Sequence, residues 1–447
     1  MPGSDSSVKQ DLSPHLEWLE SFHRSSGPAA PVIAELREKG RRALAEKGFP
    51  TRRNEDWKYT DVSGLARRVF LPVASGLGRK LTEGEIFPFL YESPEWPRLV
   101  FVDGRFDREL SSLPGVVPGL VVASLAEGLA GGCGSFERCL GQLARPEFSG
   151  FTAQNSAALR EGAFIRVAAG AKVEPPLHLL FLATQEGAGS YLRNLIIVEE
   201  GAAVTFVETY ASLECGDYFT NTVSEIFAGR DAVVDCYRLQ MESPSAYHVS
   251  HVEARQEEGS RVSFTTVNTG GLLVRNDLNV LLAGERCEAT LNGLTLVDGD
   301  RHVDNHTAID HASPNCESHE LYKAVLDGRS RSVFNGKIFV RPGAQKTDAK
   351  QTNRSLMLSP LATVNTKPQL EIFADDVKCT HGATVGQLRD EEIFYLRSRG
   401  MSEDTARQLL TYGFANDIVE KIRVEPVRAF LDRVQMATLH TSFVSEG

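Results

Sequence analysis

Alternating apolar and polar residues dominate the middle of the chain. Between roughly residues 160 and 385 the helical period disappears, and short segments with the alternation of β-strands follow one another. They lie at residues 178–184, 194–200, 202–210, 232–240, 261–268 and 288–297. This pattern predicts a mainly β core that is built from many short strands.

A turn signal, mostly rich in glycine, recurs between these segments at intervals of 25 to 31 residues. Its positions are Gly170, Gly201, Gly229, Gly259, Gly284, Asn315 and Gly343. Such quasi-regular spacing favours the stacked coils of a solenoid. An antiparallel sandwich also places many short strands between turns, so the spacing alone leaves both architectures open.

The two ends of the chain have helical periodicity instead. Residues 1–70 are predicted to be mostly helical, and residues 71–160 to mix short strands, such as 98–103, with glycine-rich loops. Beyond residue 387, Ser402 is suited to cap a helix and Pro426 fits the first turn of the last helix. These C-terminal helices are expected to cap the end of the solenoid, to dock a partner, or both.

Charge and composition narrow the classes of function. The 447 residues carry a formal charge of −11, which argues against nucleic acid as a partner because backbone binding needs clustered lysine and arginine. No apolar run approaches the ~20 residues of a membrane span, and the first residues lack the apolar core of a signal peptide. We therefore expect a cytoplasmic protein of two or three domains, or of one elongated domain.

The cysteines argue against two further classes of structure. There are seven of them, and they are scattered without a CxxC pair. They are Cys133, Cys139, Cys215, Cys236, Cys287, Cys316 and Cys379. This arrangement disfavours both a disulfide framework and a self-contained four-cysteine metal site.

The most informative chemistry lies at residues 366–400. Residues 370–377 alternate and predict a strand, and Cys379 and His381 follow two residues apart. In an extended chain the two side chains share one face, with Cα atoms about 6–7 Å apart. A thiolate and an imidazole can bind one soft or borderline metal ion, although two ligands do not complete a tetrahedral site. The alternative is an ordinary strand end with a small buried thiol and a hydrogen-bonded imidazole.

A second group of candidate ligands lies at residues 301–320. It consists of His302, His306, His311, Cys316 and His319. In an extended strand His302 and His306 share a face but lie ~13 Å apart, which is too far to bind one ion. We therefore favour a structural role for these side chains along the solenoid over a metal site.

Two charged segments complete the candidates. Residues 52–61 interleave Trp57 and Tyr59 with basic and acidic residues, which favours a structural anchor over nucleic-acid binding. Residues 328–350 are basic, and they are expected to form solvated strand faces, with anion binding as the alternative. Their cations are Arg329, Arg331, Lys337, Arg341, Lys346 and Lys350. The chain contains no GxxxxGK[ST], GxSxG or HExxH sequence, which argues against nucleotide hydrolysis and the common hydrolytic sites.

Five longer segments carry a family resemblance. They are KPQLEIFADDVKCTHGATVGQL, FYLRSRGMSEDTARQLLTYGF, GRSRSVFNGKIFV, DAKQTNRSLMLSP and, near the start, FPTRRNEDWKYTD. Together they resemble the SufD family of iron–sulfur cluster assembly proteins and, more distantly, its sister family SufB, over most of residues 45–435. The resemblance implies a right-handed parallel β-helix at residues 156–386, between an α-rich N-terminal domain at 1–155 and a helical C-terminal domain at 387–447.

The same resemblance implies a function and a site. His381 stands at the cluster-site histidine of the SufD family and Cys379 at the neighbouring cysteine, so both are candidate iron ligands of a nascent cluster. The implied protein is a non-catalytic scaffold, which pairs with SufB through the end of the β-helix and with the ATPase SufC through residues ~387–435. The expected cofactor is a transient iron–sulfur cluster at the heteromeric interface, and reduced flavin and a homodimer of the isolated chain stay open.

Two alternatives belong beside this reading. SufB proteins carry a cysteine in the sequence FYC-x-x-RG, and Leu396 occupies that position here, which argues against a SufB-like homodimeric scaffold. A β-helix enzyme that acts on polysaccharides is the second alternative, and we expect no secretion signal to support it.

Overall fold

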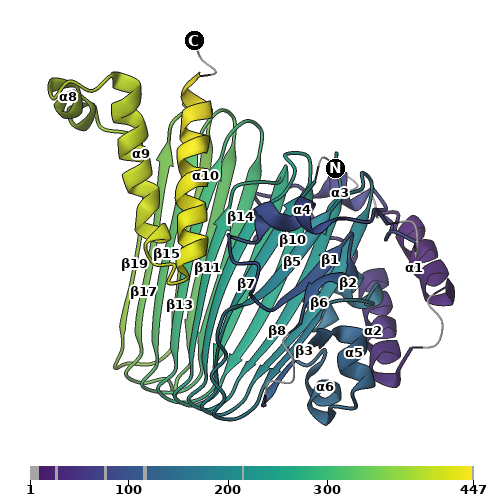
Figure 1. Cartoon of the computed structure of the whole chain (residues 1–447). Helices are drawn as coiled ribbons and strands as arrows, with labels where there is room; N and C mark the ends of the chain where they lie inside the picture. Colours follow the sequence, from purple (N-terminus) through teal and green to yellow (C-terminus); the bar gives the residue numbers. More distant parts are fainter. Residues whose placement is uncertain (1–9, 26–28, 75–77, 114–117, 214–215, 445–447) are drawn as a thin grey trace, which may run out of the picture.

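A parallel β-helix forms the body of the molecule (Figure 1). The computed structural model describes residues 10–25, 29–74, 78–113, 118–213 and 216–444. Each coil of the β-helix contributes one strand to each of two sheets, and strands two apart in the sequence pair in parallel. The prediction of a solenoid is therefore confirmed, and the antiparallel sandwich is excluded.

One sheet has ten strands and the other has nine. The ten-stranded sheet contains, in spatial order, β2 (Arg105–Ser112), β1 (Arg98–Val102), β5 (Leu177–Ala183), β7 (Ala203–Ser212), β9 (Val233–Met241), β11 (Arg261–Asn268), β13 (Glu288–Val297), β15 (Glu317–Leu326), β17 (Asp348–Met357) and β19 (Lys378–Gly386). The nine-stranded sheet contains β3 (Leu120–Ser124), β4 (Ala163–Val167), β6 (Gly189–Val198), β8 (Phe219–Ala228), β10 (Tyr247–Gln256), β12 (Leu273–Leu282), β14 (His302–His311), β16 (Arg331–Val340) and β18 (Thr363–Ile372). Only β2 and β3, at the first end, run antiparallel to their neighbours.

A left-handed backbone conformation recurs at one turn of successive coils. The residues in this position have φ between 53° and 70°. They are Gly201, Asp231, Gly259, Arg286, Asn315 and Lys346. The N–H of each donates to a carbonyl oxygen of the next coil, as from Gly259 to Glu285 at 2.8 Å. The recurring turn signal in the sequence thus reflects one conformational requirement, which glycine and asparagine meet at little cost.

The interior of the first coils is apolar and partly aromatic. Phe101, Phe181 and Tyr210 stack on one another across three strands, with ring centroids 5.1 and 4.6 Å apart. Polar groups enter the interior further along, where Arg238 forms a fully buried ion pair with Glu208 at 2.6 Å.

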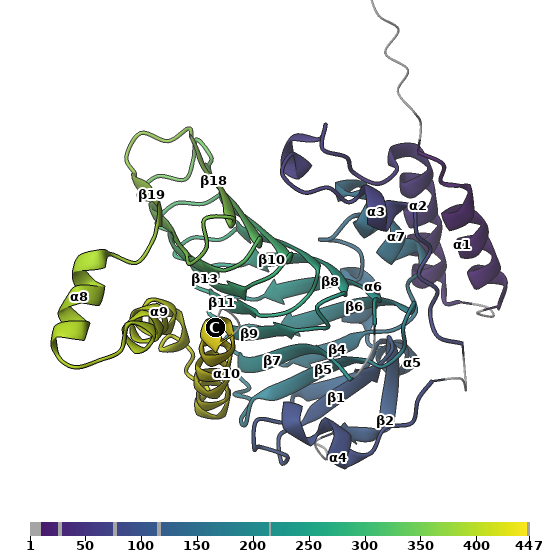
Figure 2. The ribbon, with the colours of Figure 1, turned by 90° about the horizontal axis from the view of Figure 1, so that it is seen from above.

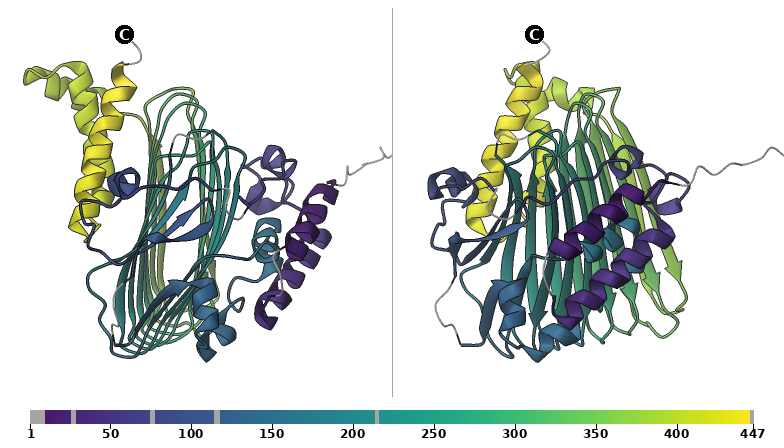
Figure 3. Two further views of the ribbon diagram at one scale, coloured as in Figure 1. Left: turned by 45° about the vertical axis from the view of Figure 1, so that its right-hand side comes forward. Right: turned by 90° about the vertical axis from the view of Figure 1, so that its right-hand side faces the viewer.

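The longer N-terminal helices cover the outer face of the nine-stranded sheet (Figure 3), whereas residues 86–90 pack on β1, β5 and β7 of the ten-stranded sheet. The longer ones are α1 (Ser13–Ser25), α2 (Pro31–Lys47) and α7 (Gly150–Ala157). The shorter elements are η1 (Glu55–Trp57), α3 (Ser63–Ala66), α4 (Glu83–Ile86), η2 (Phe87–Phe89), α5 (Leu125–Ala130), α6 (Gly134–Cys139) and η3 (Pro146–Phe148). Leu19, Leu44 and Phe151 of the helices belong to one buried cluster with Tyr191 and Phe219 of the sheet.

A buried charge fastens this region to the sheet. Arg193 on β6 and Glu225 on β8 form an ion pair at 2.7 Å, and both side chains are fully buried. Glu225 also accepts hydrogen bonds from the backbone N–H groups of Gly141 and Leu143 at 2.8 Å. One oxygen of the carboxylate accepts from Arg193 and Gly141, and the other accepts from the backbone N–H groups of Leu143 and Ala144. Loss of Arg193 would therefore leave an unpaired charge buried between the two parts.

The C-terminal helices are α8 (Asp390–Ser398), α9 (Glu403–Val419) and α10 (Glu425–Val444). The predicted N-cap is confirmed, because Ser402 accepts a hydrogen bond from the N–H of Thr405, and Pro426 lies in the first turn of α10. The expectation that they cap the end of the solenoid is wrong. Figures 1 and 2 show α9 and α10 along the flank of the ten-stranded sheet, because their apolar residues pack on outward-facing residues of that sheet.

Candidate functional site

The last coil, formed by β18 and β19, leaves one end of the solenoid open (Figure 2). β18 pairs only with β16, and β19 only with β17, so the far edge of each has no strand partner among the described residues. Residues of both strands are exposed or half-buried, whereas most residues of β14 and β15 are buried. Such an edge presents free N–H and C=O groups to which another chain can add strands.

Cys379 and His381 lie on β19 and face the same side. In the parallel register Cys379 is opposite Ala349 and His381 is opposite Gln351. Ala349 and Gln351 are buried in the interior, so the two candidate ligands continue the inward-facing rows of the solenoid. The prediction that they share a face is confirmed. Their role as ligands stays a prediction.

The two side chains differ in exposure. Cys379 is half-buried against Ile338, Ala349 and Ala374, whereas His381 is exposed at the open end. Burial raises the pKa of the Cys379 thiol, and the nearby Asp348 carboxylate adds to the effect. The thiol form therefore predominates at neutral pH, and a metal ion would have to displace its proton.

The strand before this pair ends earlier than the alternation predicts. The sequence predicts a strand at residues 370–377, but β18 ends at Ile372 and the chain turns before β19 begins at Lys378. Asp375 and Asp376 lie in the bend, where aspartate side chains favour turns over strands. The alternating pattern at residues 370–377 thus spans the end of one strand and the turn that follows it.

Apolar side chains surround the open end. Leu361 is 65% exposed and Phe373 is 57% exposed, and Ile372 and Val385 are exposed as well. The inward-facing rows of β18 add Val364 and Leu370, which are half-buried. An apolar patch that combines with unpaired strand edges is typical of a surface that a partner covers.

A buried polar pair lies directly beneath His381. Gln351 on β17 and Glu320 on β15 are 2% and 3% exposed, and the Gln351 Nε2 donates to the Glu320 Oε2 at 2.5 Å. Among the described residues Glu320 has no cationic partner, and burial raises its pKa to about 7. Sequence reasoning missed both residues, since the pattern around them does not show which polar residues of β15 and β17 face inward.

The histidine-rich segment at residues 301–320 does not converge on one point. His302 and His306 face outward from β14, where they contact Thr60 at 2.9 Å and Asp304 at 3.0 Å. His311 is buried at the other end of β14, and burial lowers its pKa to about 4.

The other two members of that segment lie elsewhere. Cys316 is buried in a turn, and His319 is exposed on β15 in the other sheet. No group of three or more histidine, cysteine or acidic side chains in the described ranges is arranged to hold a metal ion. The preferred structural interpretation of the segment thus agrees with the placement of each residue.

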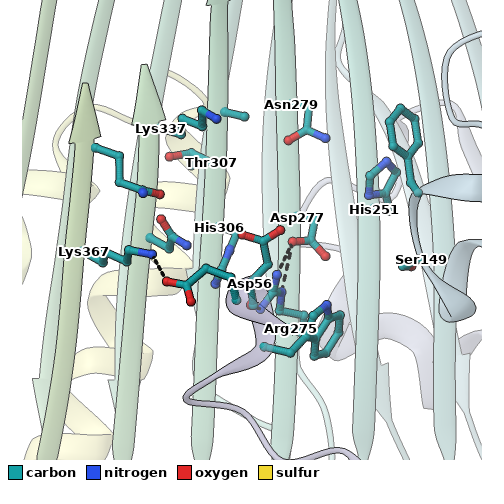
Figure 4. Close-up of a pocket in the computed structure, with 16 residues that line it drawn as sticks. Asp56, Ser149, His251, Arg275, Asp277, Asn279, His306, Thr307, Lys337 and Lys367 are labelled. Carbon is teal, nitrogen blue, oxygen red and sulfur yellow. Dashed lines mark hydrogen bonds and ion pairs between the residues drawn. The ribbon is translucent and has the colours of Figure 1, made fainter. Parts of the chain in front are cut away.

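A cavity of about 370 Å³ lies on the outer face of the nine-stranded sheet (Figure 4). Its floor is one row of five successive strands, with His251, Asp277, His306, Asn335 and Lys367 directly opposite one another in register. Its walls are residues 55–57 and 148–149. Lys367 lies on β18 of the last coil, but Cys379 and His381 do not line this cavity.

The charges in this cavity compensate one another. Lys367 pairs with Glu55, and Arg275 pairs with Asp277 at 2.7 Å (Figure 4). Lys337 pairs with Glu371 at 2.7 Å. A compensated floor offers no net charge with which to select an ionic ligand, so we assign no function to the cavity.

The segment at residues 52–61 is anchored in this region. Trp57 is 6% exposed, and the Arg275 guanidinium lies 4.2 Å from the centre of its ring. Arg275 itself is fixed by Asp304 at 2.7 Å, and Thr60 bonds to Asp304 and His302. The predicted role as a structural anchor is confirmed by these contacts.

The basic segment at residues 328–350 is a set of solvated ion pairs. Arg329 pairs with Asp300, Arg341 with Asp310, and Lys350 with Asp348. These cations are largely exposed, as the solvated-face interpretation requires, and the pairs leave little charge to hold an anion.

The six cysteines that the structure describes have free thiols, and Cys215 lies outside the described residues.

Comparison with known protein families identifies the family to which this chain belongs. The SufBD protein N-terminal region matches residues 21–179, and the SufBD core domain of SUF system FeS cluster assembly matches residues 181–414. The chain belongs to the SufBD family of iron–sulfur cluster assembly proteins. The SufBD core domain ends within α9, so it includes the whole open end with Cys379 and His381.

Individual relatives within the SufBD family extend this match to nearly the whole chain. The iron–sulfur cluster assembly protein SufD of Escherichia coli is 34% identical over 437 residues, which cover 96% of each chain. A SufBD family protein of Synechocystis is 33% identical over 92% of each chain, and a chloroplastic protein of Arabidopsis thaliana is 30% identical over 92% of this chain and 87% of its own. None of the helices in the described ranges is long and apolar enough to cross a membrane.

The variant Trp57→Ala should release the anchored segment from the sheet. Loss of a buried tryptophan costs about 3–5 kcal/mol, and the backbone near Arg52 and Lys58 would become open to trypsin. We expect cleavage there to be at least roughly tenfold faster in limited proteolysis. Tyr59→Ala is the matched control because Tyr59 is exposed, and equal proteolysis of both variants would contradict the anchor.

The variant Glu320→Gln should remove a pH-dependent loss of stability. The pKa of Glu320 is about 7 in the folded chain against 4.5 for an unperturbed glutamate. Between these two pH values the carboxyl group is therefore protonated in the folded state and ionised in the unfolded state. Wild-type stability therefore falls as pH rises through this interval, and the variant should gain about 2–3 kcal/mol over wild type between pH 5 and pH 8. Urea unfolding at both pH values measures this gain. Glu317→Gln, on the exposed side of β15, should show no such gain, and equal behaviour of the two variants would refute the assignment.

Proposed function

We propose that this chain is the SufD-like, non-catalytic scaffold subunit of an iron–sulfur cluster assembly complex. The single observation that carries the proposal is the open last coil, which presents Cys379 and His381 side by side in the SufBD core domain. The 34% identity to the SufD protein of Escherichia coli across 96% of the chain favours a SufD-like role over the role of a more distant relative.

The partner proposed for the open end is a SufB-like subunit. A sister protein of the same fold has strands of matching spacing, so its own last coil can continue both sheets through main-chain hydrogen bonds. Its apolar interior would cover Leu361, Ile372, Phe373 and Val385. In the absence of that subunit a second copy of this chain can occupy the same edge as a homodimer.

The joint of the two subunits is the proposed place of cluster assembly. Iron and sulfide are the substrates there, and the cluster is held transiently before it is transferred. Cys379 and His381 supply a sulfur and a nitrogen ligand, and because two ligands do not complete a tetrahedral iron site, the partner must supply others. The raised pKa of Cys379 favours His381 as the first ligand and the thiol as an auxiliary one.

The C-terminal helices are the proposed docking site of the ATPase SufC. α8 stands away from the body of the molecule (Figure 2) and exposes Phe394 and Tyr395, which are 73% and 56% exposed. Met401, just before α9, and Leu409, on α9, are exposed apolar residues as well. ATP hydrolysis would take place in SufC, and its motion, passed through α8 and α9, would open the joint to iron and sulfide.

A SufB-like homodimeric scaffold is the second candidate. Leu396 on α8 argues against it, because a leucine cannot accept sulfur at the position where SufB proteins carry a cysteine. Reduced flavin is an optional further cofactor of the proposed complex. The cavity in Figure 4 has no feature that favours flavin binding. The divisions at residues 155 and 386 stay proposals, and β1 and β3 before the first division belong to the two sheets.

The variant His381→Ala should slow cluster assembly in the intact complex. The chain is co-expressed with the SufB-like and SufC-like proteins of its own source and purified without oxygen, and iron and sulfide uptake is followed by absorbance. Loss of a metal ligand should lower the initial rate by at least about tenfold, while the complex itself still forms. His319→Ala, an exposed histidine on the outer face, is the control. A wild-type rate in His381→Ala would sink the proposed ligand role.

The variant Phe394→Ala should weaken the binding of SufC. An exposed aromatic residue at the centre of an interface is commonly worth about 2 kcal/mol, which corresponds to a roughly 30-fold higher Kd. Titration calorimetry of the purified chain with the SufC-like protein measures the change. Glu391→Ala in the same helix is the control for helix integrity, and an unchanged Kd in Phe394→Ala would place the docking surface elsewhere.

A further inference from the structure

Three inward-facing side chains form a row beneath the open end. In register, His381 on β19 is opposite Gln351 on β17, which is opposite Glu320 on β15. Neighbouring parallel strands lie about 4.8 Å apart, so each side chain of the row is within reach of the next. Glu320 and Gln351 are joined by a hydrogen bond, and the His381 ring lies at the exposed end of the row.

A glycine makes the position of the Gln351 amide possible. A Cβ atom at Gly336 on the facing sheet would lie 2.2 Å from the Gln351 Nε2 and 2.8 Å from its Cδ. Such distances are too short for non-bonded atoms, so the amide fills the space that Gly336 leaves free. The amide is thereby held in one place, and its Nε2 is occupied by the carboxyl group of Glu320.

The other atom of this amide has no partner. The Gln351 Oε1 is buried without a hydrogen bond, although the residue is only 2% exposed. A buried carbonyl oxygen without a donor is costly, and most such groups in native proteins are paired. The register places His381 opposite Gln351 on the adjacent strand, and its ring N–H has no hydrogen-bond partner among the described residues.

We propose that the Gln351 Oε1 accepts a hydrogen bond from a ring N–H of His381, so that Gln351 is the positioning residue of that histidine. The bond fixes which ring nitrogen carries the proton and leaves the other nitrogen with its lone pair at the open end. The Glu320 carboxyl holds the amide in the orientation that this bond requires. The inference rests on the proposed function for the purpose of the free nitrogen, but the hydrogen bond itself is independent of that function.

The ring nitrogens of His381 report the bond directly. The full chain is labelled with ¹⁵N-histidine and studied by NMR, and the His381 signals are identified by their loss in His381→Ala. One tautomer should predominate in the wild type, and in Gln351→Leu the two tautomers should mix. If Gln351→Leu leaves the tautomer ratio unchanged, the proposal is overturned.

A second variant reaches the same bond without altering Gln351. Gly336→Ala should displace the amide and shift the tautomer ratio in the same direction as Gln351→Leu does. Gln369→Leu, on the outer side of β18, changes a glutamine of the same end of the solenoid outside the row and should leave the ratio at its wild-type value. An equal shift in Gln369→Leu would mean that the NMR signals report only a general disturbance, and the proposal would fail.

Cluster assembly in the complex separates this inference from the proposed function. Loss of a residue that orients a metal ligand commonly costs 10–100-fold, so Gln351→Leu should lower the assembly rate by at least about tenfold. A shifted tautomer with normal assembly in both Gln351→Leu and His381→Ala would uphold the hydrogen bond and refute the ligand role. An unchanged tautomer together with impaired His381→Ala would refute the positioning role alone.

Discussion

Hydrogen bonding between successive coils is the constraint on which the rest of this structure depends. In a parallel β-helix every strand takes its partners from the coils before and after it, and so do the turns, whose left-handed residues bond to the next coil. In such an arrangement the strands of the first and last coils lack a hydrogen-bonding neighbour on one side. At the first end the chain reverses direction and lays β2 and β3 antiparallel on the sheets. At the other end, within the described residues, nothing equivalent follows β18 and β19.

The chemistry of the chain gathers at this unsatisfied end. Cys379 and His381 are ordinary members of inward-facing rows, and they become accessible only because no further coil covers them. The same position in an earlier coil would bury them completely, as it buries Ala349 and Gln351. A scaffold that builds a cluster between two proteins thus needs no dedicated pocket, since the meeting of two open ends encloses the ligands.

Buried polar side chains interrupt the apolar interior, and one such pair lies beneath the open end, against the usual preference of a protein core. Phe101, Phe181 and Tyr210 fill the early coils, whereas Glu320 and Gln351 lie beneath the open end. Burial of an uncompensated carboxyl group costs free energy, and its pKa rises as a result. Residues that oppose stability in this way are commonly functional.

The sequence predicted the fold well where a local requirement repeats in every coil. Gly201, Gly259 and Asn315 were recognisable because a left-handed turn restricts the choice of residue. The same position is held by Asp231 and Arg286 in other coils, and there the signal fell on a neighbouring glycine. The placement of Cys379 and His381 on one face followed from the two-residue period of a strand alone.

The missed features depend on contacts between distant segments. Gln351 and Glu320 are 31 residues apart, and their pairing requires the register of β15 and β17. The flank position of α9 and α10 depends on outward-facing apolar residues of the ten-stranded sheet, which a strand pattern does not distinguish from inward-facing ones. Periodicity gives the two faces of a strand but not which of them is the interior.

The one-sided pairing of the last coil also has a consequence for the order in which the molecule loosens. In a linear array each unit is stabilised by its nearest neighbours, and an end unit has one neighbour where an inner unit has two. β18 and β19 should therefore exchange their amide hydrogens with solvent before β14 or β15 does. A subunit that docks on this edge supplies the missing neighbour. Local unfolding of the last coil and binding of the partner are therefore coupled equilibria.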